Sequence, residues 1–103
     1  MIGADELAKM KKDSILINTA RGHIVDEQAL ADAIKSGHLN GGAVDAFAVE
    51  PDIGDCPLIG LENVLLTPHM CSRSPDLVER VAKCVNENLE NLYYGRPLVR
   101  VVN

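Results

Sequence analysis

The stretch from Ile15 to Asp26, ILINTARGHIVD, constrains the fold of this chain more than any other. Its apolar start is too short for a buried helix and is flanked by polar residues, which is typical of a strand covered on both faces of a parallel sheet. Small residues then lead to Arg21 and Gly22, and a helical pattern begins at Asp26. An arginine at the carboxyl end of such a strand lies where open α/β sheets bind their ligands. The pattern therefore predicts a ligand site beside Arg21.

Composition narrows the classes of function. A chain of 103 residues with 47% hydrophobic residues fits a single small globular domain. The net charge of -5 and the scattered basic residues argue against a nucleic-acid partner. We expect no membrane partner, because no apolar segment is long enough to cross a bilayer and no signal-peptide core is evident. The three cysteines, Cys56, Cys71 and Cys84, lack metal-ligand spacing, which predicts reduced thiols in a cytoplasmic protein and no metal site.

Helical and strand-like patterns alternate along the chain. Asp26 is suited to cap the start of one helix and Gly37 to end it, while Ser74 and Pro75 suit the start of another. The order of strand, helix and strand implies a parallel crossover. We expect helices over 3–12, 27–36 and 74–95, strands over 14–19, 42–47 and 64–67, and a loop over 48–62.

Polar residues follow the end of each predicted strand. Arg21, the segment from Asp45 to Glu50, and His69 all come after apolar runs. Parallel strands joined by crossovers present their carboxyl ends at the same edge of the sheet, so we expect these residues to meet in one cleft. A guanidinium, a carboxylate and an imidazole together form a plausible set for anion binding and acid–base chemistry.

Each of these residues also has a simpler explanation. Arg21 can form a surface ion pair, Glu50 can be a solvated loop residue, and His69 can satisfy a backbone carbonyl. Asp45 is more informative, because an acid inside an apolar strand needs a partner. The pattern alone names no reaction.

Several motifs resemble the D-isomer-specific 2-hydroxyacid dehydrogenases. These motifs cover nearly the whole chain and follow one another in the same order as in the family. Two places depart from the family pattern: the residues after His69, and His23 itself, which stand where the family usually has small residues. The motifs are INTARG at 17–22, VDEQAL at 25–30, GHL at 37–39, DAFAVEP at 45–51 and NVLLTPH at 63–69.

The resemblance implies roles for individual residues. Arg21 matches the arginine that holds the substrate's carboxylate and keto oxygen, a task that suits a planar guanidinium. His69 matches the general acid that protonates the ketone, and Glu50 matches the carboxylate that orients its ring and favours the imidazolium. Asp45 matches the residue that hydrogen-bonds the nicotinamide carboxamide. The implied cofactor is NAD, with NADP left open, and the implied cofactor contacts are Thr19, Ala20, Arg21, Asp45 and His69.

The family's Gly-rich phosphate loop and separate substrate domain have no counterpart here. Gly41 and Gly42 follow a predicted helix instead of opening one, so they form no dinucleotide fingerprint. We therefore expect residues 1–103 to be the C-terminal portion of a dinucleotide-binding domain. The expected fold is α/β, half of a doubly wound, Rossmann-type parallel sheet of about three strands with flanking helices and a long C-terminal helix.

The implied function is part of an NAD-dependent oxidoreductase that acts on a small 2-hydroxy or 2-oxo acid, with the isolated fragment inactive. The alternative is a non-catalytic dinucleotide-sensing or corepressor-like interaction module, since the resemblance extends to such proteins. Turnover of 2-oxo acids by the longer protein distinguishes the two. We also expect a homo-oligomer, because the strand over 14–19 would be left as an open edge. The chains can associate through strand pairing, through exchange of the long C-terminal helix, or through both.

Overall fold

The structure is a computed structural model that describes residues 1–102. It divides into two compact units, the first spanning Met1–Cys71 and the second beginning at Ser72. Each unit is described by itself.

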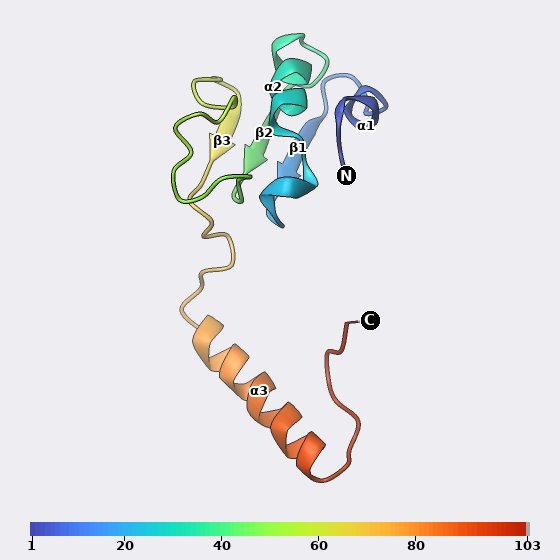
Figure 1. Ribbon diagram of the computed structural model, residues 1–103, viewed down its shortest axis with the longest axis vertical. Coiled ribbons are helices and arrows are strands. Elements are labelled where there is room, and N and C mark those ends of the chain that lie inside the picture. Colours follow the sequence, from blue (N-terminus) through green and yellow to red (C-terminus); the bar gives the residue numbers. More distant parts are fainter. Residues whose placement is uncertain (103) are drawn as a thin grey trace. The chain divides into compact units, whose positions relative to one another are not determined.

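The first unit is built on a three-stranded parallel sheet, drawn as arrows in Figure 1. Its strands are β1 (Ile15–Asn18), β2 (Gly41–Val44) and β3 (Val64–Leu66), in the order β1-β2-β3. Ile17 lies opposite Ala43, and Ala43 lies opposite Leu65. This confirms the three predicted strands, although β2 ends at Val44 rather than continuing to residue 47. All three carboxyl ends therefore meet at the same edge of the sheet.

Short helices flank these strands. They are α1 (Ala4–Ala8), a 3-10 turn η1 (Gly22–Ile24) and α2 (Glu27–Lys35), so the first helix is shorter than the predicted range of 3–12. Asp26 caps α2 as predicted, since its Oδ1 accepts the Ala29 N–H at 2.9 Å. Gly37 follows α2 with φ of 74°, the left-handed conformation that favours glycine at a helix end.

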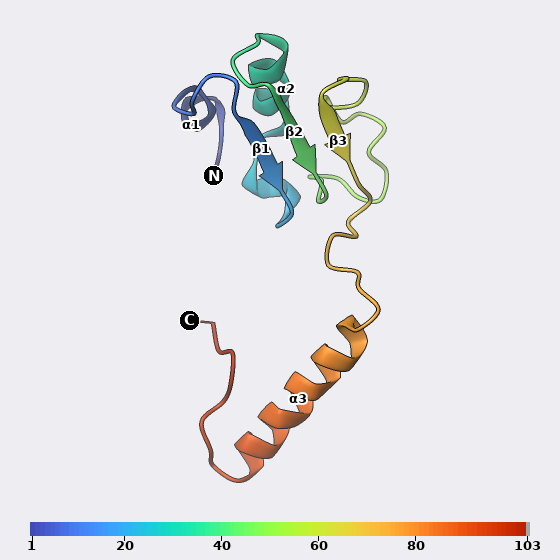
Figure 2. The ribbon, with the colours of Figure 1, turned by 180° about the vertical axis from the view of Figure 1, so that it is seen from behind.

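The core lies between α2 and one face of the sheet. Leu30 and Ala31 of α2 are fully buried, and Ile34 is nearly so. They pack in one cluster with Leu16 of β1 and Val44 of β2. Figures 1 and 2, which show opposite sides, agree that α2 lies on one face only.

The other face of the sheet is exposed. Ile15 and Ile17 of β1 are 57% and 67% exposed, and Leu65 of β3 is 64% exposed. The prediction that the first strand is covered on both faces is therefore wrong for the part of the chain that the structure describes. The physical reason is that alternate side chains of a strand point to opposite faces, and α2 reaches only one of them.

The second unit is dominated by helix α3 (Leu77–Tyr93). The predicted start at Ser74 and Pro75 is wrong, because the Ser74 carbonyl accepts the Leu77 N–H at 3.0 Å, which forms a turn before the helix. Asp76 is instead the N-cap, without a capping bond from its side chain. Beyond the helix, the Asn88 side chain bonds both the N–H and the carbonyl of Val99. No helix within residues 1–102 is long and apolar enough to cross a membrane.

Candidate active site

The carboxyl edge of the sheet brings together the segments that follow its strands. Asp45 comes directly after β2, and His69 comes three residues after β3. The His69 N–H donates to the Asp45 carbonyl at 2.8 Å, which joins these two segments. The predicted convergence is therefore confirmed for Asp45, Glu50 and His69.

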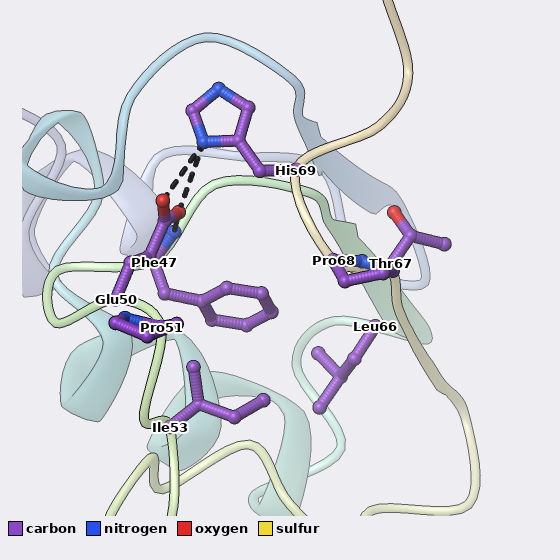
Figure 3. A pocket seen from close by; sticks show the side chains of 8 residues that line it. All are labelled: Phe47, Glu50, Pro51, Ile53, Leu66, Thr67, Pro68 and His69. Atoms are coloured by element: carbon purple, nitrogen blue, oxygen red, sulfur yellow. Dashed lines mark hydrogen bonds and ion pairs between the residues drawn. The ribbon is translucent and has the colours of Figure 1, made fainter. Parts of the chain in front are cut away.

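Glu50 and His69 form a hydrogen-bonded pair across nineteen residues of sequence (Figure 3). His69 Nδ1 lies 2.9 Å from Glu50 Oε2 and 3.2 Å from Oε1. This confirms the predicted contact. In Figure 3 the second ring nitrogen, Nε2, points away from Glu50. The arrangement leaves Nε2 available to exchange a proton with a bound molecule while Nδ1 is held.

The Glu50 carboxylate is held by the backbone as well as by the histidine. Its Oε1 accepts the Phe47 N–H at 2.7 Å. The hydrogen bond to His69, and next the one from Phe47, lower the pKa of Glu50 below its ordinary value of 4.5. Glu50 is therefore ionised at neutral pH and fixes which ring nitrogen of His69 faces it.

Asp45 holds the turn that carries His69. Only 3% of Asp45 is exposed. Its Oδ1 accepts the Thr67 hydroxyl at 2.6 Å and the Met70 N–H at 2.9 Å, and its Oδ2 accepts the Cys71 N–H at 2.9 Å. The carboxylate thus bonds residues on both sides of His69, whose φ of 49° is unusual for a residue other than glycine. These are the partners that an acid beside an apolar strand requires.

Asp45 and Cys71 shift each other's ionisation in opposite directions. The side chains of Cys71 and Thr67, followed by the backbone N–H groups of Cys71 and Met70, hold the pKa of Asp45 well below its usual range. The hydrogen bond to Asp45, its negative charge and burial together raise the pKa of the Cys71 thiol. A raised pKa means that a smaller fraction of this exposed thiol is ionised at neutral pH.

Arg21 is placed at the same edge by a turn that Asn18 builds. The buried Asn18 side chain accepts the Ala20 N–H at 3.1 Å and donates to the Arg21 carbonyl at 3.0 Å. Arg21 itself is exposed, and its Nη1 donates to the Ala20 carbonyl at 2.6 Å. Within residues 1–102, no hydrogen bond joins Arg21 to Glu50 or His69. Arg21 also forms no ion pair among these residues, so the guanidinium N–H groups other than the one bonded to Ala20 can meet an anion.

Thr19 and Ala20, the two predicted cofactor contacts after β1, are exposed at this edge. The Thr19 carbonyl lies 3.8 Å from the Cys71 sulfur, which brings the segments after β1 and β3 together. The sequence reasoning missed Asn18 and Thr67 as supports of the site. The signal for both is a polar side chain at the last positions of an apolar strand, where it can bond the following turn.

A cavity of about 250 Å³ lies beside the Glu50–His69 pair, and both residues line it (Figure 3). Its walls are mostly apolar and come from β3 and from the loop after β2, and they include Phe47, Pro51, Ile53, Leu66 and Pro68.

The described residues resemble known proteins over their full length. The model of the "D-isomer specific 2-hydroxyacid dehydrogenase, NAD binding domain" family matches residues 1–71, which are the residues of the first unit. Glyoxylate reductase of Korarchaeum cryptofilum is 47% identical over 103 residues, which are all of this chain and 31% of that protein. Glyoxylate/hydroxypyruvate reductase B of Yersinia pestis (strain Pestoides F) is 42% identical over the same span, 32% of its length. The chain thus spans about a third of the length of these relatives.

Solved structures share the fold. A D-isomer specific 2-hydroxyacid dehydrogenase from Xanthobacter autotrophicus Py2, in complex with NADPH and MES, superposes with a TM-score of 0.86 at 36% identity. The superposition covers 99% of this chain and 41% of that one. The three parallel strands therefore correspond to part of a Rossmann-type sheet, as the sequence predicted.

Proposed function

The chain belongs to the D-isomer specific 2-hydroxyacid dehydrogenase family, and we propose that it forms the C-terminal portion of the NAD-binding domain of an enzyme that reduces a small 2-oxo acid. Glyoxylate and hydroxypyruvate are the substrates that the relatives' names suggest. The observation that carries the proposal is the Glu50–His69 pair at the carboxyl edge of the sheet, with one ring nitrogen held and the other free.

In this proposal His69 is the general acid. Protonated His69 donates its Nε2 proton to the substrate's keto oxygen, and in the reverse reaction Nε2 takes the hydroxyl proton. Glu50 stabilises the imidazolium through Nδ1 at 2.9 Å. Arg21 binds the substrate carboxylate, since its fork of N–H donors matches two carboxylate oxygens. NAD(P)H supplies the hydride when it is bound.

The residues around the edge fit the nicotinamide end of that cofactor. Asp45 accepts three hydrogen bonds, two at Oδ1 and one at Oδ2. The Cys71 thiol also bonds this carboxylate, and because a thiol is a weak donor, a carboxamide N–H can take its place. Thr19 and Ala20 are exposed residues at the same edge of the sheet. Gly41 and Gly42, in contrast, lie inside β2 and not at the start of a helix, so they supply no pyrophosphate cradle.

The 103-residue chain by itself therefore binds NAD weakly and turns over no substrate. It also associates with itself, through strand pairing at the edge of β1 that no other described strand occupies, through exchange of helix α3, or through both. Calorimetric titration with NAD and size-exclusion chromatography with light scattering test both statements. A stable monomer with micromolar affinity for NAD contradicts them.

The decisive experiment uses a protein of the relatives' length that contains this sequence. We expect it to reduce glyoxylate or hydroxypyruvate with NADH or NADPH, and His69→Asn to lower kcat by roughly 10²–10⁴-fold. A protein that binds dinucleotide without reducing any 2-oxo acid contradicts the proposal and favours the sensing or corepressor-like module.

A further inference from the structure

Glu27, the first residue of α2, makes a contact that its place in the helix does not explain. Its Oε1 accepts the Ala48 N–H at 2.7 Å, across twenty-one residues of sequence. Glu27 is half-buried, and its carboxylate also lies beside Cys56 in the same loop, where burial and then the Glu27 charge raise the pKa of the thiol. A carboxylate at the start of a helix favours the helix by itself, but here it also holds the segment after β2.

The peptide group between Phe47 and Ala48 is clamped from a second side by Gly22. A Cβ atom added to Gly22 would lie 1.9 Å from the Phe47 carbonyl carbon, 2.0 Å from its oxygen and 2.2 Å from the Ala48 nitrogen. No side chain fits at that separation, so the two backbones touch directly. Glu27 at the N–H and Gly22 at the carbonyl together fix this peptide group.

Phe47 in turn fixes Glu50. The Phe47 N–H donates to Glu50 Oε1 at 2.7 Å, and Glu50 Oε2 faces His69 Nδ1 at 2.9 Å. The Phe47 N–H belongs to the preceding peptide group, which shares the Phe47 Cα with the 47–48 group, so a shift of the 47–48 group is passed to this N–H and to the carboxylate that orients the histidine ring. Hydrogen bonds to a charged acceptor are stronger than those between neutral groups, so the loss of the Glu27 bond lets the segment move.

We propose that Glu27 is a positioning residue for the Glu50–His69 pair, acting through the Phe47–Ala48 peptide group. The inference rests on the proposed function, because the pair matters for catalysis only if His69 is the general acid. Glu27 touches neither substrate nor cofactor in this account.

The test follows the pair directly in the 103-residue chain, by NMR titration of the Glu50 carboxyl carbon and by the chemical shifts of the two His69 ring nitrogens at one fixed pH. We expect Glu27→Ala to move the Glu50 midpoint up towards 4.5 and to remove the asymmetry between the two ring nitrogens. Glu27→Gln keeps an oxygen acceptor for the Ala48 N–H and should retain the original values. Gln28→Ala is the matched control, since Gln28 bonds only Asp32 on the exposed side of α2.

Glu27→Asp keeps the negative charge at the start of α2 but is one methylene too short to reach Ala48. It should behave like Glu27→Ala while keeping the helix folded, so it serves if the alanine variant unfolds. An unchanged Glu50 titration together with unchanged His69 ring-nitrogen shifts in a folded Glu27→Asp variant overturns the inference.

In the longer enzyme, the same variants should lower kcat while KM for the 2-oxo acid changes little, with recovery in Glu27→Gln. Equal loss in Gln28→Ala overturns the positioning role. If the titrations shift as expected but the parent enzyme reduces no 2-oxo acid, the proposed function fails and the structural link between Glu27 and the pair stands.

Discussion

Helices α2 and α3 have similar apolar stripes but opposite environments. Leu30 of α2 is fully buried, and α2 packs against β1 and β2 through that face. Helix α3 is nearly twice as long, yet none of its residues is buried. Its stripe, Val78, Val81, Val85, Leu89 and Leu92, is between 51% and 78% exposed.

The difference shows what an amphipathic pattern determines. Spacing identifies which face of a helix is apolar, but it does not identify the surface that covers that face. Helix α2 lies between β1 and β2 in the sequence, so the sheet that covers its apolar face belongs to the same unit. The described residues of the second unit provide no surface that covers the apolar face of α3.

Leucine truncation should separate the two helices most clearly. Leu30→Ala removes a fully buried side chain and should cost about 2–5 kcal/mol of unfolding free energy. Leu89→Ala changes an exposed side chain and should stay within about 0.5 kcal/mol. Urea denaturation of the 103-residue chain, followed by circular dichroism, measures both. A large cost for Leu89→Ala would show that α3 is covered in solution.

Replacing an arginine by lysine should affect catalysis at the candidate site but not on the surface of α3. In a protein of the relatives' length, Arg21→Lys keeps the charge but loses the planar fork, and should reduce transition-state stabilisation by about 1.5–3 kcal/mol. Arg80→Lys alters an exposed ion pair with Asp76 at 3.3 Å and should leave kcat/KM unchanged. Steady-state kinetics with glyoxylate decide the matter, and equal efficiencies for Arg21→Lys and the unaltered enzyme would remove Arg21 from the proposed mechanism.

The two helix starts should also differ. Asp26→Ala deletes the side chain that caps α2 at 2.9 Å and should cost about 0.5–2 kcal/mol of unfolding free energy. Asp76→Ala deletes an N-cap side chain that bonds no backbone N–H of α3, so its effect should be smaller. Thermal unfolding of the two variants under identical conditions gives the comparison. A larger loss for Asp76→Ala would contradict the geometry of both caps.

The smallest expected effect is the loss of the carboxylates' contribution to stability at acidic pH. The pKa values of Asp45 and Asp76 both lie below the ordinary 3.8, Asp45 through Cys71, Thr67 and backbone donors, and Asp76 through Ser74 and Arg80. A lowered pKa means that the carboxylate's contribution to stability is complete above pH 3.8 and disappears as pH falls through the lowered value. Carboxyl NMR titration should place Asp45 below Asp76. The reverse order would show that the His69 turn is looser than described.

Local patterns predicted the elements of the first unit well. The effects of Asp26, of Gly37 and of the apolar runs in β1 and β3 depend on neighbouring residues. They can therefore be predicted from the sequence. The meeting of Asp45, Glu50 and His69 was also predictable, because parallel strands bring their carboxyl ends to one edge.

Contacts between distant backbone groups were not predictable. Nothing near Glu27 in the sequence indicates that its carboxylate reaches Ala48, and Gly22 looks like an ordinary turn residue. The start of α3 was missed because Ser74 and Pro75 also fit a turn that precedes a helix. These outcomes depend on tertiary geometry or on competition between two local structures of similar stability.

The order β1-β2-β3 has a consequence for hydrogen exchange. β2 is bonded on both sides, so its amide protons should exchange with deuterium only through global unfolding. In the part of the chain that the structure describes, β1 is bonded to a strand on one side only, and its outward-facing amides should exchange quickly. Slower exchange confined to Ile15–Asn18 would then show that another strand has paired with this edge, and it would show which residues take part in the pairing.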